Sequence, residues 1–188
     1  MNRPAPLTQR AQQAVAAVVA ASDRAIDATM GNGHDTVFLA RQVAPDGEVA
    51  AFDIQTAALH ETQQRLDEAG LLSLAHLYHC GHEHMLRQLP DDWRGRVSAV
   101  MFNLGYLPGS DKTIITQATS TIAALHQALA LLRPGGLLSV LLYRDHAGAG
   151  TESDAVTRWF QDLSPDHRLQ VLESPGPALF LARKPAET

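Results

Sequence analysis

The sequence predicts an α/β fold with a doubly wound sheet that is mostly parallel and ends in an antiparallel hairpin. Short apolar runs alternate with helical segments of about 8 to 17 residues, which is the pattern of parallel βαβ units with right-handed crossovers. The last two apolar runs are joined only by the turn "ESPGPA", so we expect them to pair as a hairpin. In such a sheet, ligands bind beyond the carboxyl ends of the strands.

Apolar runs and helical periodicity define the elements in chain order. The expected strands are residues 25–28, 47–53, 74–78, 97–102, 137–143, 169–172 and 179–183. The expected helices are residues 7–21, 36–43, 56–69, 83–89, 116–132 and 154–163. Gly70 and Pro90 end the third and fourth helices, and "RPGG" at residues 133–136 is expected to turn the fifth helix into the fifth strand.

Length and composition indicate one globular domain over residues 1–188. Of the 188 residues, 45% are hydrophobic and 19% are charged, and no apolar run approaches the roughly 20 residues that span a bilayer. The apolar patch at residues 14–21 is short, so we expect neither a signal peptide nor a membrane partner. Cys80 is the one cysteine, which favours a reducing, cytoplasmic location. The net charge of -5 gives no global attraction to nucleic acid but leaves room for a local basic patch.

The segment "IDATMGNGHDT" joins the first expected strand to its helix. Gly31 and Gly33 permit a tight turn and a close ligand approach, next to a helix N-terminus with free N–H groups. Asp53 ends the second strand, where a carboxylate can accept hydrogen bonds from both hydroxyls of a ribose. Together these features predict a nucleoside cofactor. The alternative is a plain strand-to-helix turn with Asp53 as a helix N-cap.

S-adenosylmethionine fits this turn better than NAD. The third glycine of the dinucleotide fingerprint is absent, which argues against a pyrophosphate cradle. The methionine carboxylate and ammonium groups need instead a mixed polar turn, such as Asp27, Asn32 and Gly33.

Histidines cluster in "AHLYHCGHEHM", after the third strand. A zinc site built from His76, His79, His82 and His84 is one interpretation. Because alternate strand residues point to opposite faces, four ligands are not expected to converge, and we predict no metal. His82 and Glu83 instead follow the strand, where they would cover the adenine of the cofactor, whereas His76 and His79 fit ordinary strand positions.

The segment "VMFNLGYLPGSDK" begins as a buried strand and then presents an amide. We expect Asn103 to leave the fourth strand beside the cofactor, where its oxygen can accept the N–H groups of an amine and aim the lone pair of the amine nitrogen. The Asn-Pro-Pro-Tyr loops of amino methyltransferases work in this way. Tyr106 could stack on a planar substrate. The alternative is an Asx turn that caps the strand, with Tyr106 packed on the loop.

Together, "DATMGNGHDT", "FDIQ", "GHE" and "NLGYLPGSDK" closely resemble the YtqB-like rRNA methylase family, which is associated with MnmM, a tRNA wobble-uridine methyltransferase. The resemblance runs from about Ile26 to the C-terminus. It implies a class I, Rossmann-like methyltransferase dependent on S-adenosylmethionine. The implied reaction methylates the aminomethyl group of 5-aminomethyl-2-thiouridine in the tRNA anticodon loop.

The resemblance also implies roles for individual residues. Asn32 and Gly33 would face the methionine part, Asp53 and Gln55 the ribose and adenine edge, and His82 and Glu83 the adenine side. The acceptor site would be shaped by Asn103, Leu104, Gly105 and Tyr106. The implied partner is the tRNA anticodon stem-loop, and a homodimer is compatible with the resemblance.

The sequence departs from the family pattern in two loops. In "YRDHAGAG", Asp145 and Ala149 replace family glycines, whereas Tyr143, His146 and Gly148 remain; a second departure is "SPGP" at residues 174–177. His146 is a candidate base or orienting group, with a surface histidine as the alternative.

Arg144, Lys112 and Arg133 are candidates for phosphate contacts. Two alternative functions stay open. One is a methyltransferase acting on rRNA or on a small-molecule amine, and the other is a non-catalytic nucleoside-binding module.

Overall fold

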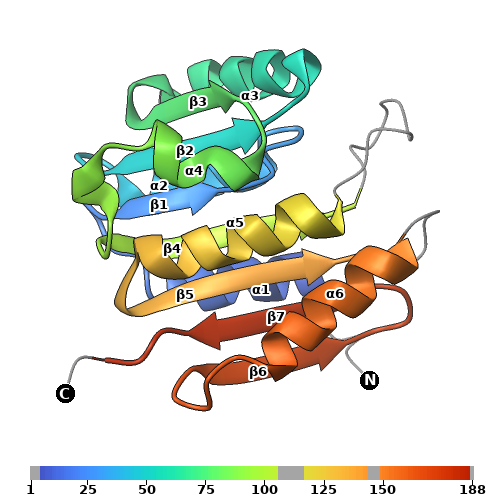
Figure 1. Ribbon diagram of the computed structural model, residues 1–188. Coiled ribbons are helices and arrows are strands. Elements are labelled where there is room, and N and C mark those ends of the chain that lie inside the picture. The colour runs from blue at the N-terminus through green and yellow to red at the C-terminus, as the bar shows by residue number, and fades with distance from the viewer. Residues whose placement is uncertain (1–4, 106–116, 144–148, 187–188) are drawn as a thin grey trace.

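The computed structural model describes residues 5–105, 117–143 and 149–186. Its described residues form a seven-stranded sheet with the order β3-β2-β1-β4-β5-β7-β6 (Figure 1). The strands are β1 Arg24–Asp27, β2 Glu48–Asp53, β3 Ala75–His79, β4 Val97–Leu104, β5 Leu132–Leu142, β6 Arg168–Glu173 and β7 Ala178–Arg183. Strands β1 to β5 are parallel, and β7 runs antiparallel to both β5 and β6. The predicted mostly parallel sheet and its C-terminal hairpin are confirmed.

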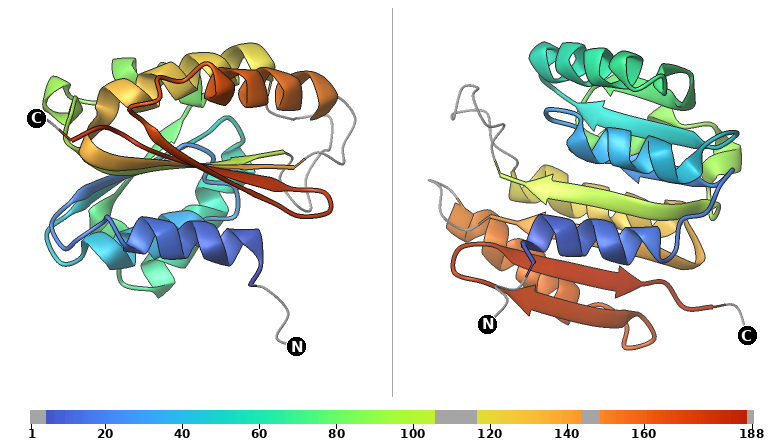
Figure 2. Two further views of the ribbon diagram at one scale, coloured as in Figure 1. Left: turned by 90° about the horizontal axis from the view of Figure 1, so that it is seen from below. Right: turned by 180° about the vertical axis from the view of Figure 1, so that it is seen from behind.

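Helices cover both faces of this sheet. They are α1 Leu7–Ala16, α2 His34–Val43, α3 Thr56–Glu68, α4 Met85–Gln88, α5 Ala118–Leu131 and α6 Ala149–Gln161. Figure 2 shows α5 and α6 on one face and α1 and α2 on the other. Three short 3-10 turns, Leu72–Leu74, His82–His84 and Asp91–Trp93, complete the connections in the described residues. Of the helices described, none is both long and apolar enough to cross a bilayer.

The central strand β4 supplies residues to the core on both faces. Val100, Phe102 and Leu104 pack in the cluster that also holds Leu125 of α5 and Phe160 of α6, and Phe160 stacks on Phe180 of β7 at 4.7 Å. Ala99 and Met101, which alternate with them, pack in the cluster on the α1 and α2 face. This period-two alternation, apolar on both sides, is typical of a strand that helices cover on both faces.

Several predicted boundaries were wrong. Helix α1 ends at Ala16 instead of residue 21, because the chain must turn before β1, through Ser22 at φ 66°. The "RPGG" segment lies within β5 as a bulge. The register passes from Val97 opposite Leu132 to Ala99 opposite Leu137, with Gly135 at φ 74°. Helix α6 begins earlier than expected, at Ala149.

The fourth strand does not stop at Phe102, as the sequence had suggested. Asn103 pairs with Leu141, and Leu104 pairs with Leu142, so Asn103 is still part of β4. The backbone N–H of Asn103 donates to Thr29 Oγ1 at 2.7 Å, across the gap to the loop after β1. The expectation that Asn103 leaves the strand is therefore corrected: the amide is presented by the strand itself.

Candidate active site

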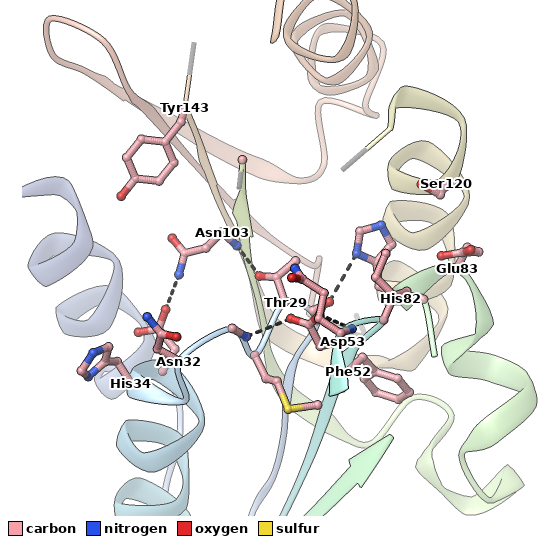
Figure 3. A pocket seen from close by; sticks show the side chains of 18 of the residues that line it. Thr29, Asn32, His34, Phe52, Asp53, His82, Glu83, Asn103, Ser120 and Tyr143 are labelled. Atoms are coloured by element: carbon pink, nitrogen blue, oxygen red, sulfur yellow. Dashed lines mark hydrogen bonds between the residues drawn. The ribbon is translucent and has the colours of Figure 1, made fainter. Parts of the chain in front are cut away.

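A cavity of about 870 Å³ lies at the carboxyl end of the sheet (Figure 3). It opens where the strand order reverses. Strands β2 and β3 lie on one side of β1, and the strands that follow them in the chain, beginning with β4, lie on its other side. This is the ligand position of an open α/β sheet, and the volume falls in the range of roughly 300–1,000 Å³ typical of cofactor sites. The residues that line it are Thr8, Gln12, Ala28, Thr29, Met30, Gly31, Asn32, His34, Asp35, Phe52, Asp53, Ile54, Gln55, Gly81, His82, Glu83, Asn103, Gly105, Gln117, Ser120 and Tyr143.

Asp53 ties the end of β2 to the turn after β1. Its Oδ2 accepts a hydrogen bond from the Gly31 N–H at 3.0 Å, and its Oδ1 accepts one from the Gln55 N–H at 2.9 Å. The N-cap of α3 is Gln55, so Asp53 does not cap that helix. The carboxylate is thus held at the cavity wall, and each of its oxygens keeps a second lone pair for a ligand hydroxyl.

Asp27 lies beneath the same turn. The residue is 1% exposed, and its carboxyl group accepts hydrogen bonds from the Thr36 hydroxyl at 2.6 Å and from the Thr29 N–H at 3.1 Å. Burial, together with the charge of nearby Asp35, raises its pKa to about 7. Asp27 therefore shapes the turn from below.

His82 and Glu83 form another wall. Because a carbonyl oxygen only accepts, the 3.3 Å contact with the Ala28 oxygen assigns the proton to Nδ1 of His82. Burial lowers the pKa of His82, which favours the neutral ring with Nε2 as an acceptor. At Gly81 a Cβ would meet Glu83 Oε2 at 2.2 Å, so the missing side chain makes room for the Glu83 carboxylate.

The other end of the cavity contains Asn103, Asp35 and Tyr143. The Asn103 Nδ2 donates a hydrogen bond to Asp35 Oδ2, and Gln12 Nε2 of α1 donates to Asp35 Oδ1 at 2.8 Å. This pairing fixes the amide, and its oxygen points to the side on which Tyr143 lies (Figure 3). Burial and the charge of Asp35 raise the pKa of the Tyr143 phenol, which is therefore a neutral hydrogen-bonding group at neutral pH.

Comparison with known proteins identifies the family. The model of the family described as "Putative rRNA methylase" matches residues 49–175, which is more than half of the chain. The chain belongs to this family. A chloroplastic tRNA (mnm(5)s(2)U34)-methyltransferase of Arabidopsis thaliana is 40% identical over 147 residues, 74% of this chain and 53% of the relative. The chain thus spans about half the length of that relative.

Solved structures agree with membership of the rRNA methylase family. A Clostridium thermocellum protein of the same description superposes with a TM-score of 0.91 at 32% identity, over 98% of this chain and 100% of the other. A Streptococcus mutans protein described as a putative methyltransferase, in complex with SAH, superposes with a TM-score of 0.84 at 30% identity, over 98% and 99% of the two chains. The fold is therefore that of the class I methyltransferases.

Most of the predicted cofactor residues line the cavity of this rRNA methylase family member. They are Gly31, Asn32, Asp53, Gln55, His82, Glu83 and Asn103. Asp27 and Gly33 do not line it. Gly33 is the N-cap of α2 at φ 79°, and a Cβ there would meet both Thr62 Cα and Thr62 Oγ1 at 2.8 Å. Glycine at position 33 is thus required by the packing of α2 on α3.

Other predicted residues have different outcomes. Tyr106, Lys112, Arg144 and His146 lie outside the described residues. Arg133 lies in the bulge at the opposite end of β5 from Tyr143, where it donates to the Ser98 hydroxyl at 2.9 Å and to the Val18 carbonyl at 3.0 Å. Arg133 therefore lies away from this cavity, and a phosphate contact by Arg133 stays a prediction.

The histidines of the third strand have structural partners. His79 Nε2 bonds to the Ile54 carbonyl at 2.9 Å, and His76 lies 3.4 Å from Glu48. In the part of the chain that the structure describes, no group of three His, Cys, Asp or Glu residues converges on a metal position.

Sequence reasoning missed several residues of the site, above all Asp35. Gln12 and Thr8 come from α1, and Gln117 and Ser120 come from the start of α5; nothing in the local sequence marks them. Asp35 did carry a signal, because it lies within the glycine motif and in the first turn of α2.

Proposed function

We propose that this chain is an S-adenosylmethionine-dependent N-methyltransferase that methylates the aminomethyl group of 5-aminomethyl-2-thiouridine at the tRNA wobble position. Support comes from the 40% identical relative, whose name states a tRNA mnm(5)s(2)U34 methyltransferase activity, and from the related Streptococcus mutans structure that contains SAH.

The cavity suits S-adenosylmethionine by size and by the order of its polar groups. Asn32 and the α2 N-terminus would hold the methionine part, Asp53 and Gln55 the ribose and adenine edge, and His82 and Glu83 the adenine side. When bound, the cofactor supplies an electrophilic methyl group. A neutral His82 suits an adenine neighbour, because an uncharged ring adds no positive charge beside the base.

The observation that carries the proposal is the orientation of Asn103. Its amide nitrogen is committed to Asp35, so its oxygen is the atom offered to an acceptor group. That oxygen would accept an N–H of the substrate amine and turn the nitrogen lone pair toward the methyl position. Tyr143 and the predicted acceptor residues Gly105 and Tyr106 would complete this end of the site, with His146 as the proposed proton acceptor or orienting group.

The proposed partner is the tRNA anticodon stem-loop. The net charge of -5 means that phosphate contacts must be local, and Lys112 and Arg144 are the residues we propose for them. A homodimer stays a prediction, which light scattering at micromolar concentration would test.

Nucleoside mass spectrometry tests the reaction. Purified protein, S-adenosylmethionine and tRNA carrying 5-aminomethyl-2-thiouridine should yield 5-methylaminomethyl-2-thiouridine. The Asn103→Ala variant should lose at least about a hundredfold in turnover, as expected for a group that orients the reacting atom, while its SAH affinity stays within about twofold. Full activity of that variant would remove the role of Asn103.

Parallel reactions separate the alternatives. A product on rRNA or on a free amine, with unmodified tRNA, would support the other acceptors. SAH binding without methyl transfer to any of them would support a nucleoside-binding module.

A further inference from the structure

We propose that Asp35 recognises the positive charge of the acceptor, so that this site prefers a basic amine to a neutral group of the same size. The inference rests on the proposed function, because it concerns the acceptor end of the same cavity. It assigns to Asp35 a direct contact with the substrate nitrogen.

Asp35 is placed where its carboxylate can contact a ligand. It lies in the first turn of α2, half-buried, and lines the cavity beside Asn103. Gln12 donates a hydrogen bond to one of its two oxygens, and Asn103 donates one to the other. Because each carboxylate oxygen accepts about two hydrogen bonds, a substrate ammonium can still bind while both protein donors stay in place.

The charges around Asp35 favour a cationic ligand. None of the described residues that line the cavity is Lys or Arg, and its basic side chains are His34 and His82. His34 is exposed. Burial lowers the pKa of His82, which favours its neutral form. The acidic side chain of Asp27, which interacts electrostatically with Asp35, has a raised pKa and is held beneath the turn. Among these residues, then, no fixed positive charge cancels that of Asp35, and a cationic ligand would do so.

Methyl transfer to an amine develops positive charge on the nitrogen. The ammonium must first give a proton to solvent or to the proton acceptor proposed above; the lone pair of the neutral amine then forms the new C–N bond, while the electrons of the C–S bond stay with sulfur. Positive charge therefore moves from sulfur to nitrogen, until a second proton leaves to solvent. A carboxylate beside the nitrogen stabilises this developing charge in the transition state, as well as the ammonium form on arrival.

A positioning role through Asn103 is the competing explanation. Asp35 could act only by fixing the amide, in which case its loss would weaken all acceptors alike. A charge-reading role instead weakens basic acceptors selectively, so the ratio between two acceptors separates the two explanations.

The test uses two anticodon stem-loop RNAs that differ at one group, 5-aminomethyl against 5-hydroxymethyl on the wobble uridine. With SAH present, the wild-type protein should bind the aminomethyl RNA about ten- to a hundredfold more tightly, the range of a hydrogen-bonded charge contact. Asp35→Asn should reduce that ratio to near one, while SAH affinity stays within about twofold. Asp35→Glu, which retains the charge, should keep part of the preference.

The matched control is Asp67→Asn, which removes an exposed carboxylate of α3 and should leave the ratio unchanged. Equal binding of the two RNAs by the wild-type protein would overturn the inference, and this arm requires no variant to fold. Equal weakening of both RNAs in Asp35→Asn would also overturn it. Failure of the proposed function is distinct, because the wild-type protein would then form no methylated nucleoside in the product assay.

Discussion

Two aspartates on either side of one glycine turn have different surroundings. Asp27 is buried and held by Thr29 and Thr36, whereas Asp35 is half-buried and bonded to Gln12 and Asn103. Burial raises the pKa of Asp27 to about 7, well above the usual range of a carboxyl group, and the charge of Asp35 adds to this effect. The sequence alone does not separate such roles, because both residues are acidic and adjoin the same motif.

The pKa of Asp27 predicts how stability depends on pH. Its pKa is 3.8 in ordinary surroundings and about 7 in the folded protein, so between these values the native state binds more protons than the unfolded state. Stability should therefore fall as pH rises from about 4 to 7, by at most about 1.4 kcal/mol per pH unit from this group. Asp27→Asn should flatten that slope in urea unfolding measured at several pH values. Asp67→Asn should keep the wild-type slope, and an unchanged slope in Asp27→Asn would contradict the assignment.

The residues found from sequence share a simple signal. Asp53, His82 and Asn103 are polar groups at or just beyond the ends of apolar strands, and a parallel sheet brings such ends to one edge. Gln12 and Ser120 carry no such signal, because their place in the cavity depends on how α1 and α5 pack on the sheet. Arg133 does not share the signal either, because it lies at the amino end of its strand, away from the cavity.

At the scale of elements, the strands were predictable because buried parallel strands are continuous apolar runs. Their ends were less so. Strand β4 extends to Leu104 because the backbone N–H of Asn103 donates a hydrogen bond to the Thr29 hydroxyl. Strand β5 includes "RPGG" as a bulge opposite β4. Both outcomes depend on neighbouring strands that a local pattern does not contain.

The contact between α2 and α3 predicts the effect of adding one methyl group. Gly33→Ala would place a Cβ 2.8 Å from the Thr62 Cα, and alanine disfavours φ 79°. Because a backbone atom cannot swing aside, we expect the free energy of unfolding to fall by about 2–4 kcal/mol. Gly70→Ala is the matched control, with φ 68° and open space around its Cβ, and should cost only about 1 kcal/mol. Equal losses in denaturant unfolding would mean that the helix contact does not matter.

At the scale of the whole molecule, the cavity joins segments that are far apart in sequence. Residues 28–35 follow β1, residues 53–55 end β2, residues 81–83 follow β3, and Thr8 and Gln12 belong to α1. The hairpin of β6 and β7 lies at the opposite side of the sheet from β3. A single domain over residues 1–188 stays a prediction, but a ligand in this cavity would connect the N-terminal helix to the carboxyl ends of strands β1 to β5.

This arrangement predicts the pattern of protection when SAH binds. At about 100 times its Kd, SAH should stabilise the protein by about 2.7 kcal/mol and slow hydrogen exchange in residues 8–12, 28–35, 53–55 and 81–83. The turn at residues 173–178 is an internal control: its Ser174 N–H, bonded to the Pro177 carbonyl, lies in a partly exposed hairpin and should exchange by local opening at an unchanged rate. Protection confined to residues 28–35 would mean that α1 takes no part in binding. Equal slowing in the hairpin turn would mean that SAH acts on global stability alone, and not through contacts at the carboxyl ends of the strands.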